Sequence, residues 1–321
     1  TTGNYALDPH YSLPYVETWN LDVQKTLPWG IVMNVGYNGS KGNHLDITSA
    51  PRATVSSPNT NPANVVFDYD QAAAFSKFTA GTLRVNKRLT KGFAVGANYQ
   101  YSHLIDNASS EGTSSNVGAQ DWQDLAAEEG NSSLDVRHKV SGTWLYELPF
   151  GQDKFWFTTG TASHILEGFS ISGNYTFATG MPLNPYFAAE TSSVACGTAG
   201  TLRPNLNPGV PVKAGGGSLH QWFNTAAYSE PAANVAYPCE VFGSAARNSI
   251  AGPGTVTNNV ALSKTMQLGD TRSMEIRATL NNAFNTVQYS GVDTNVASPS
   301  FGQVTSVGSM RSFQFMGRFR F

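Results

Sequence analysis

The sequence predicts an all-β protein, more narrowly an antiparallel up-and-down β-barrel segment whose strands cross a membrane. Three observations lead to this fold class. Apolar and polar residues alternate over stretches of about ten residues, which is the pattern of strands that face two different environments. The connections between these stretches alternate between short and long, and charged residues on the apolar faces lie near the ends of the stretches.

About nine stretches of the 321-residue chain carry the strand pattern. In the first, Trp19 and Leu21 fall on one face, whereas Asn20 and Asp22 fall on the other. A period of two predicts a strand, and only residues 161–168 suggest a short turn or helix. The sequence contains no run of about 18 apolar residues, so no transmembrane helix is predicted. The stretches are residues 15–27, 31–39, 81–89, 92–103, 135–150, 169–180, 254–268, 273–284 and 311–321.

The connections sort into two kinds. Residues 28–30, 90–92 and 269–272 are short, and the link after Phe150 is moderate. Outer-membrane barrels have short turns on the periplasmic side and longer loops outside the cell. We therefore expect residues 1–14 to end an outside loop and four long connections to form extracellular loops. These long connections cover about residues 41–75, 105–134, 181–253 and 290–308.

Charges on the predicted apolar faces avoid the middle of the stretches. Lys25, Lys87 and Lys264 each lie within about five residues of a short turn, where a long side chain can reach lipid headgroups. A lysine at the membrane midplane would cost about 2–4 kcal/mol. Most other charges fall in the opposite register, which predicts a wet lumen. A sheet packed on a soluble core would show the same division of charges between its two faces, but it would not need aromatic residues beside the short turns. Those residues are Trp29, Phe93 and Phe150.

Composition excludes several other classes of function. Charged residues make up 13% of the chain, about half of the ~25% usual in soluble domains. The net charge of −2 gives no basic footprint for a nucleic-acid partner. The stretch "GYNGSKGN" lacks the spacing of a phosphate-binding loop, and no motif predicts a cofactor.

Two cysteines, Cys196 and Cys239, lie in the same Gly/Pro/Asn-rich connection. They are a candidate disulfide, which would suit an oxidising compartment. Two unrelated thiols are the alternative. Neither cysteine has clustered histidines around it in the sequence, so a zinc site is not predicted.

The last stretch, "RSFQFMGRFRF", carries an aromatic face made by Phe313, Phe315, Phe319 and Phe321. Outer-membrane barrels characteristically end on such a strand, and this ending resembles the recognition element that the barrel-assembly machinery reads. That element usually has glycine five residues before the end, whereas Gly317 lies four before it. Bacterial single-chain barrels usually have an even number of strands. Nine strands therefore predict the C-terminal part of a larger barrel.

Seven stretches in the expected order resemble the C-terminal barrel of TonB-dependent outer-membrane receptors, specifically the Oar-like group with an N-terminal carboxypeptidase-regulatory-like domain. The stretches cover most of the chain. They are "LPYVETWNLDVQKTLPWGIVMNVGYNGSKGNHL", "LDVRHKVSGTWLYELPFG", "FSISGNYTFATGMPL", "WFNTAAYSEP", "ARNSIAGPGTVTNNVALSKTM", "EIRATLNNAFNTVQY" and "FGQVTSVGSMRSFQF".

The resemblance implies a transporter in the outer membrane of a Gram-negative bacterium, with a barrel of about 22 strands. It also implies a plug domain and a TonB box upstream, neither of which is in this sequence. The implied partners are outer-membrane lipid, the barrel-assembly machinery, the upstream plug and barrel strands, TonB acting through the plug, and an unidentified ligand. No covalent chemistry is implied, so the chain is not expected to be an enzyme.

The long loops contain the candidate ligand contacts. Trp122, Trp222, Phe223 and Tyr228 could stack on a sugar or an aromatic ligand, or the loops could pack on one another. The acidic segment 121–135 could hold Ca²⁺, but it lacks the 12-residue hand pattern, and a solvated loop is the alternative.

Three other functions stay open at the level of sequence. The first is a structural or adhesive outer-membrane barrel without transport. The second is an outer-membrane hydrolase with His138 or His103 as a base, although a histidine at the membrane interface explains His138 better. The third is a secreted soluble β-protein.

Overall fold

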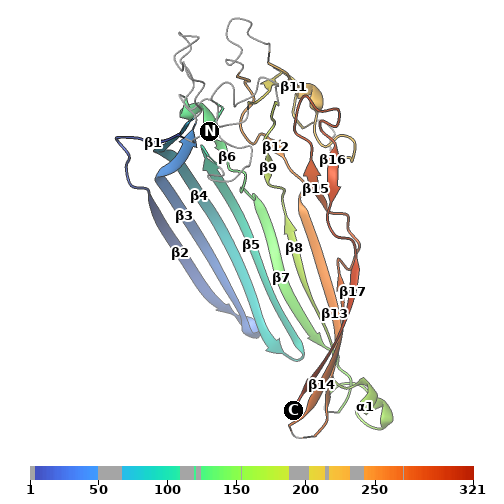
Figure 1. The fold of residues 1–321 in the computed structure, drawn as a ribbon. Helices are drawn as coiled ribbons and strands as arrows, with labels where there is room; N and C mark the ends of the chain where they lie inside the picture. The colour runs from blue at the N-terminus through green and yellow to red at the C-terminus, as the bar shows by residue number, and fades with distance from the viewer. Residues whose placement is uncertain are drawn as a thin grey trace, which may run out of the picture.

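One antiparallel sheet dominates the computed structural model (Figure 1), which describes residues 4–49, 67–108, 119–120, 124–152, 154–187, 202–213, 217–231, 242–269 and 271–321. Its long strands follow the order β17-β14-β13-β8-β7-β5-β4-β3-β2, so each pairs with its neighbours along the chain. This meander confirms the up-and-down topology and all nine predicted strands. They are β2 (Tyr15–Leu27), β3 (Ile31–Ser49), β4 (Phe67–Thr90), β5 (Phe93–Asp106), β7 (His138–Glu147), β8 (Phe169–Ala178), β13 (Thr255–Gln267), β14 (Ser273–Asn281) and β17 (Ser312–Arg320).

The connections sort by side as predicted (Figure 1). Strands β2 and β3 are joined by the 3-10 turn η1 (Pro28–Gly30), and β13 and β14 by residues 268–272. Between β4 and β5, Lys91 and Gly92 both have positive φ, as a two-residue turn that matches the strand twist requires. The link from β7 to β8 lies at the same end and contains α1 (Thr161–Leu166), the short helix that the sequence suggested. The described parts of the long connections lie at the opposite end.

Strands β3 and β4 run further than the sequence analysis indicated. Residues 41–49 and 67–75, which we assigned to a loop, are strand and pair with each other. The pairing shifts register between Gly42 and Leu45, and His44 has a positive φ of 54°. A bulge of this kind moves later side chains to the other face. The regular alternation stops there, although the strand does not.

Short strands also occur where only loops were expected. Within the predicted 1–14 loop, β1 (Asn4–Leu7) pairs in parallel with the start of β4, and β6 (Gly130–Asn131) pairs with β5. Three two-strand pairs form inside the last two long connections, and two 3-10 turns lie in the loops. The pairs are β9 (Pro182–Leu183) with β12 (Ile250–Ala251), β10 (Asn205–Leu206) with β11 (Tyr228–Ser229), and β15 (Tyr289–Val292) with β16 (Val304–Val307). The turns are η2 (Leu125–Glu128) and η3 (Thr225–Ala227).

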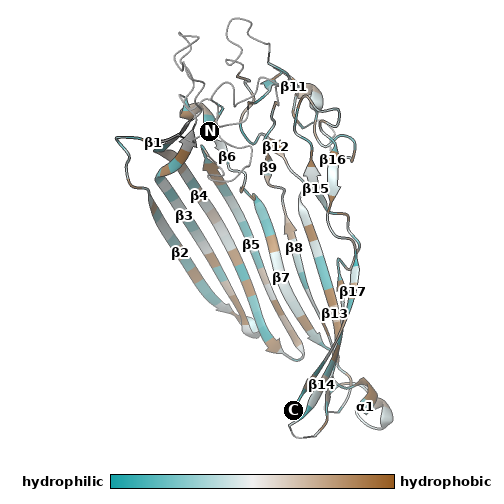
Figure 2. Cartoon of the chain, in the orientation of Figure 1, coloured by the Kyte–Doolittle hydropathy of each residue, from teal (hydrophilic) through white to brown (hydrophobic). Residues whose placement is uncertain are grey.

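The two faces of the sheet differ in polarity, and the strands show alternating bands of hydropathy (Figure 2). Pairing aligns apolar side chains into rows that cross the sheet, and no second layer within the described part of the chain covers them. Large apolar side chains on this outer face therefore remain exposed. One such row consists of Val23, Val35, Leu83, Tyr99, Val140, Phe177 and Val256.

The larger buried core lies among the loops, and the smaller one lies where the long-loop ends of β3 and β4 meet the loop at Ala119. The larger core contains Phe223, Tyr228 and Ile250, and the smaller one contains Ile47 and Ala74. We call the described residues of the two long connections between β8 and β13 and between β14 and β17, together with residues 119–135, the loop cap. Among the described helices, none has the length and apolar character needed to span a membrane.

Candidate functional site

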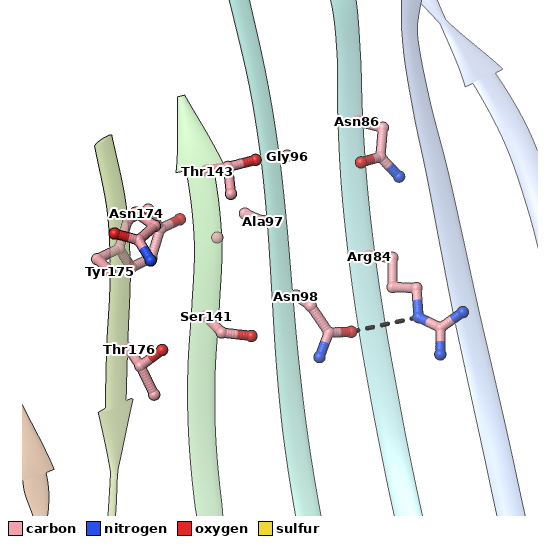
Figure 3. A pocket seen from close by; sticks show the side chains of 11 residues that line it. Arg84, Asn86, Gly96, Ala97, Asn98, Ser141, Thr143, Asn174, Tyr175 and Thr176 are labelled. Atoms are coloured by element: carbon pink, nitrogen blue, oxygen red, sulfur yellow. Dashed lines mark hydrogen bonds between the residues drawn. The ribbon is translucent and has the colours of Figure 1, made fainter. Parts of the chain in front are cut away.

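A polar wall forms the inner face of the sheet, opposite the apolar rows. Cross-strand pairing sets Arg84 beside Asn98 and continues the same row through Ser141 and Thr176. The next row contains Asn86, Thr143 and Asn174 (Figure 3). An open hollow of about 370 Å³ lies along these strands. The Arg84 Nε donates a hydrogen bond to Asn98 Oδ1 at 3.3 Å.

The free charge of the wall is mainly positive. Arg277 pairs with Glu275 at 3.1 Å. By contrast, Arg84, Lys139 and Arg318 have no acidic side chain within 4 Å among the residues that the structure describes. Amides, hydroxyls and free guanidinium groups can exchange hydrogen bonds with a polar or anionic surface. The polar face that the charge pattern predicted is therefore present, and a wet lumen behind it stays a prediction.

Two buried ion pairs hold the loop cap together above this wall. Arg203 pairs with Glu128 at 2.5 Å, and Arg247 pairs with Asp106 at the end of β5. Arg247 also donates to the backbone carbonyl of Asp106, and its Nε donates to the Glu128 carbonyl at 2.9 Å. All four side chains are almost completely buried. Buried charges of this kind persist only where several hydrogen bonds satisfy them.

Gln120 extends this network between separate loops. Its side-chain amide donates to the Gly243 carbonyl at 3.0 Å and accepts from the Arg203 backbone amide at 3.0 Å. Its own backbone amide donates to Glu128 at 3.1 Å. Because the partners come from three parts of the chain, the network fixes the loops relative to the strand ends.

Three of the predicted ligand contacts lie in or beside the larger buried core. They are Phe223, Tyr228 and Trp222. Phe223 and Tyr228 are only 3% and 5% exposed, and both rings pack edge-on against Phe301. For Phe223 and Tyr228 the structure contradicts a ligand contact and supports the alternative, because the loops pack on one another here. Trp222 is partly exposed, and its indole N–H donates to the Ala251 carbonyl at 2.8 Å. A ligand contact through Trp222 stays a prediction.

Among the described loop residues, three titratable groups have shifted pKa values. Burial raises the pKa of Tyr228, although its hydrogen bond to Ser249 acts in the opposite direction. Burial and the nearby Asp293 carboxylate raise the pKa of Tyr186. For Asp293 itself, burial favours the neutral acid, but hydrogen bonds from Ser298, Ser300 and the Asn295 amide outweigh it and lower the pKa.

Several predicted positions fall outside the described residues. Trp122, Cys196 and Cys239 are among them, so the disulfide and one candidate ligand contact stay predictions.

Three described carboxylates of the acidic segment have separate structural partners. Glu128 belongs to the ion network, and Asp124 accepts from the Ala127 amide at 3.2 Å. Asp135 accepts from the Leu104 amide at 2.8 Å and pairs with Arg137 at 3.1 Å. Within the described ranges, no group of three potential metal ligands occurs.

The two candidate bases also have structural partners. His138 lies on the outer face, with its Nδ1 2.9 Å from the Tyr99 hydroxyl and its ring against Tyr101. His103 Nε2 lies 3.1 Å from Asn131 Oδ1. In the described part of the chain, neither histidine is hydrogen-bonded to a serine hydroxyl, as the base of a serine nucleophile should be.

Aromatic and basic side chains gather on the outer face at the short-turn end. The Lys87 ammonium lies 5.1 Å from the centre of the Phe93 ring, and Lys264 lies 5.0 Å from that of Phe169. Trp29, in η1, is 83% exposed. This arrangement agrees with the aromatic girdle of a membrane barrel.

The aromatic face of the last strand lies at an edge of the sheet. Phe313 and Phe315 contact each other with ring centres 4.6 Å apart, and Phe319 stacks with Phe321 at 6.2 Å. All four rings are exposed. Strand β17 pairs with β14 on one side, and no pairing among the described residues joins β17 to β2.

A model of the outer membrane beta barrel domain matches residues 1–314. The chain belongs to this outer-membrane β-barrel family. It is thus a transmembrane β-barrel segment of the outer membrane, and the outer apolar face is its lipid-contacting face. No curated protein sequence matches the chain.

A solved structure of an outer membrane transporter shares the fold of this chain. The outer membrane transporter YddB from Escherichia coli matches with a TM-score of 0.51 and 9% identity, over 100% of this chain and 34% of that chain. The pyoverdine outer membrane receptor FpvA from Pseudomonas aeruginosa matches with a TM-score of 0.41 and 14% identity, over 95% of this chain and 29% of that one. The chain therefore spans about a third of the length of these structures.

The ion network of the loop cap left no recognisable pattern in the sequence. Arg203 and Arg247 gave no signal beyond being isolated arginines in Gly/Pro/Asn-rich loops, and their partners lie 75 and 141 residues away. An isolated charge in such a loop is usually solvated, so only the fold could identify the pairs.

Proposed function

We propose that this chain is the C-terminal part of the barrel of a TonB-dependent outer-membrane transporter of the Oar-like group. The observation that supports this most is the pairing of an exposed apolar face with an opposite polar wall in one open sheet. Unpaired backbone groups at β2 and β17 would each cost several kcal/mol in lipid. Further strands of the same protein would pair with both edges and complete a barrel of about 22 strands.

The polar wall would then line a lumen that an upstream plug domain occupies. Its free cations and neutral polar groups offer many weak hydrogen bonds, which suit a surface that must slide or separate when TonB pulls the plug. The loop cap would bind the ligand outside the cell, with Trp222 as a candidate contact. The chain carries out no covalent chemistry in this scheme.

Insertion would depend on the aromatic edge strand. We propose that Phe313, Phe315, Phe319 and Phe321 form the element recognised by the barrel-assembly machinery. Their exposure on one side of an edge strand leaves both the rings and the strand backbone available to a partner.

Energy-dependent opening of the lumen tests the transporter proposal. In the full-length protein with Cys196 and Cys239 replaced by serine, Asn98→Cys puts a thiol on the wall, and Ser218→Cys puts one on an exposed loop. A membrane-impermeant maleimide is added to intact cells growing in their own medium. We expect the wall cysteine to react faster in cells with TonB and a proton gradient than in cells without either, and the loop cysteine to react equally in both.

A wall cysteine that reacts at the same rate with and without TonB would contradict transport. That result would favour a structural or adhesive barrel of the same fold.

A further inference from the structure

The link between β7 and β8 is unlike the other connections at the short-turn end. It runs over residues 148–168, includes α1, and exposes four large apolar side chains. The exposed fractions are 80% for Phe155, 54% for Trp156, 55% for Phe157 and 58% for Ile165. A cluster of this kind marks an interaction surface more often than chance exposure does.

Local contacts hold the aromatic cluster in place. Phe150 stacks with Trp156 at 6.0 Å between ring centres and meets Phe157 edge-on at 5.8 Å. The Trp156 amide donates to the Pro149 carbonyl at 2.9 Å, and the Gly151 amide donates to the Trp156 carbonyl at 3.1 Å. The rings are therefore presented by a built turn.

Phe157 is also held in an unfavourable backbone conformation, with φ at 54°. A bulky residue rarely adopts the left-handed region, which costs of order 1–3 kcal/mol, and such strain clusters at functional positions. A turn that needed only to connect two strands would place glycine there, as Gly160 and Gly168 do in the same link.

Lys264 shows on which side of the sheet α1 lies. Its side chain belongs to the apolar register of β13, where it is paired with Phe169 on β8 and Ile276 on β14. The Lys264 ammonium lies over the Phe169 ring and donates a hydrogen bond to the Ile165 carbonyl, near the C-terminal end of α1. The end of α1 thus reaches the lipid-contacting face, at the end where the chain turns (Figure 1).

We propose that residues 154–166 form an interfacial anchor that lies in the phospholipid headgroup layer of the leaflet at the short-turn end. The exposed rings would enter the boundary between headgroups and acyl chains, where aromatic side chains are favoured. Lys264 marks the headgroup level, because a lysine on a lipid-facing strand extends its ammonium toward water. Continuity with a face already in lipid favours phospholipid as the occupant over a periplasmic protein. The inference rests on the barrel fold and does not require transport.

Lipid-dependent quenching of single tryptophans tests this anchor. The full-length protein is reconstituted into vesicles of phospholipid brominated near the glycerol end of the acyl chain. The emission of Trp156 is obtained by subtracting the spectrum of Trp156→Phe from that of the wild type. Trp19, on the outer face of β2, and Trp222, in the loop cap, are obtained in the same way as a lipid-facing and a water-side reference.

We expect Trp156 to lose most of its emission in brominated lipid, as Trp19 does, while Trp222 does not. In ordinary vesicles with iodide in the water, Trp156 should be protected relative to the same residue in the unfolded protein. Phe155→Ser should reduce the quenching of Trp156 by lipid, whereas Thr158→Ala, at an exposed polar position of the same link, should not.

Two results would overturn the anchor. Quenching of Trp156 by iodide but not by lipid would place it in water, and protection from both would place it under protein. In either case, quenching of Trp19 by lipid would show that the barrel itself is inserted. If Trp19 also escaped lipid, the membrane position of the whole sheet would fail, and the proposed transporter with it.

Discussion

The sheet and the loop cap differ in which side chains they expose and which they bury. On the sheet, Leu21 and Phe315 project from the outer face without a covering layer, whereas in the cap Phe223 and Ile250 are buried. The cap also buries the charge of Arg247, which a small apolar core would normally exclude. Both regions belong to one chain, and we attribute the difference to the solvent that each region meets.

Lipid removes the reason to hide apolar side chains on the sheet. The hydrophobic effect arises from transfer out of water, and a side chain that faces acyl chains is already in an apolar medium. Strand hydrogen bonds and rows of side chains in register then hold the sheet. In the cap, water is present, and rings and ion pairs are buried together as in a soluble domain.

The largest expected effect is a loss of stability in the loop cap that leaves the sheet unchanged. Arg247→Met in the full-length protein leaves Asp106 buried without its guanidinium, and loss of one partner of a buried pair costs about 3–5 kcal/mol. Hydrogen exchange followed by mass spectrometry should show faster exchange in residues 104–107, 128–132 and 245–250. Exchange in β2 and β3 should stay unchanged.

Arg277→Met is the matched control, because its pair with Glu275 is partly exposed on the wall and should contribute about 0–1 kcal/mol. Adding Asp106→Asn to Arg247→Met should restore part of the lost protection, since the orphaned charge is then absent. Uniform acceleration across cap and sheet would mean that the two regions do not open separately.

A charge placed on the outer face should break the sheet and spare the cap. Leu21→Arg puts a guanidinium near the middle of β2 on the lipid side, which costs about 2–4 kcal/mol at the membrane midplane. Asn20→Arg, one residue earlier, points into the polar register and should change stability little. The free energy of unfolding in urea, measured for both variants in phospholipid vesicles, checks the difference. Equal costs for the two substitutions would show that lipid does not contact this face.

The same contrast explains how far sequence reasoning could reach. The nine strands were predictable because lipid on one side and water on the other impose a strict period of two. The prediction failed at residues 41–49, where the bulge at His44 breaks that period within a continuing strand.

The loop cap was less predictable because its contacts are not periodic. Phe223 and Tyr228 are aromatic whether they face a ligand or a core, and only the packing against Phe301 distinguishes the two. The pairing of Arg247 with Asp106 joins residues 141 positions apart. No local pattern encodes such a contact.

Two glycines on the outer face, Gly39 and Gly81, differ in how closely neighbouring side chains approach them. A Cβ at Gly39 would lie 2.3 Å from the ring of Trp19 on the neighbouring strand, whereas a Cβ at Gly81 would meet nothing within 4 Å. Gly39→Ala should therefore displace the Trp19 ring and cost about 1–3 kcal/mol, as overpacking does. Gly81→Ala should be close to neutral. Urea unfolding in vesicles together with the emission maximum of Trp19 measures both, and a neutral Gly39→Ala would mean that the ring is free to move into lipid.

The smallest expected effect concerns acid, and it should again be confined to the cap. Hydrogen bonds from Ser298, Ser300 and the Asn295 amide lower the pKa of Asp293 below its ordinary value of 3.8. Because the folded-state pKa lies below the unfolded one, the carboxylate stabilises the fold fully above that ordinary value, and the contribution disappears as the pH falls through the folded-state pKa. Amide exchange in residues 293–303, corrected for its intrinsic pH dependence, should therefore accelerate only below about pH 4.

The variant Asp293→Asn is the control. Its amides should exchange somewhat faster at neutral pH, and the acid dependence should be lost, because asparagine has no proton to gain. If the asparagine variant shows the same acceleration in acid as the wild type, the acid sensitivity belongs to another carboxylate of the cap. The strands β2 and β3 should show no change over the same range, since no comparable set of hydroxyl and amide donors surrounds a carboxylate among their described residues.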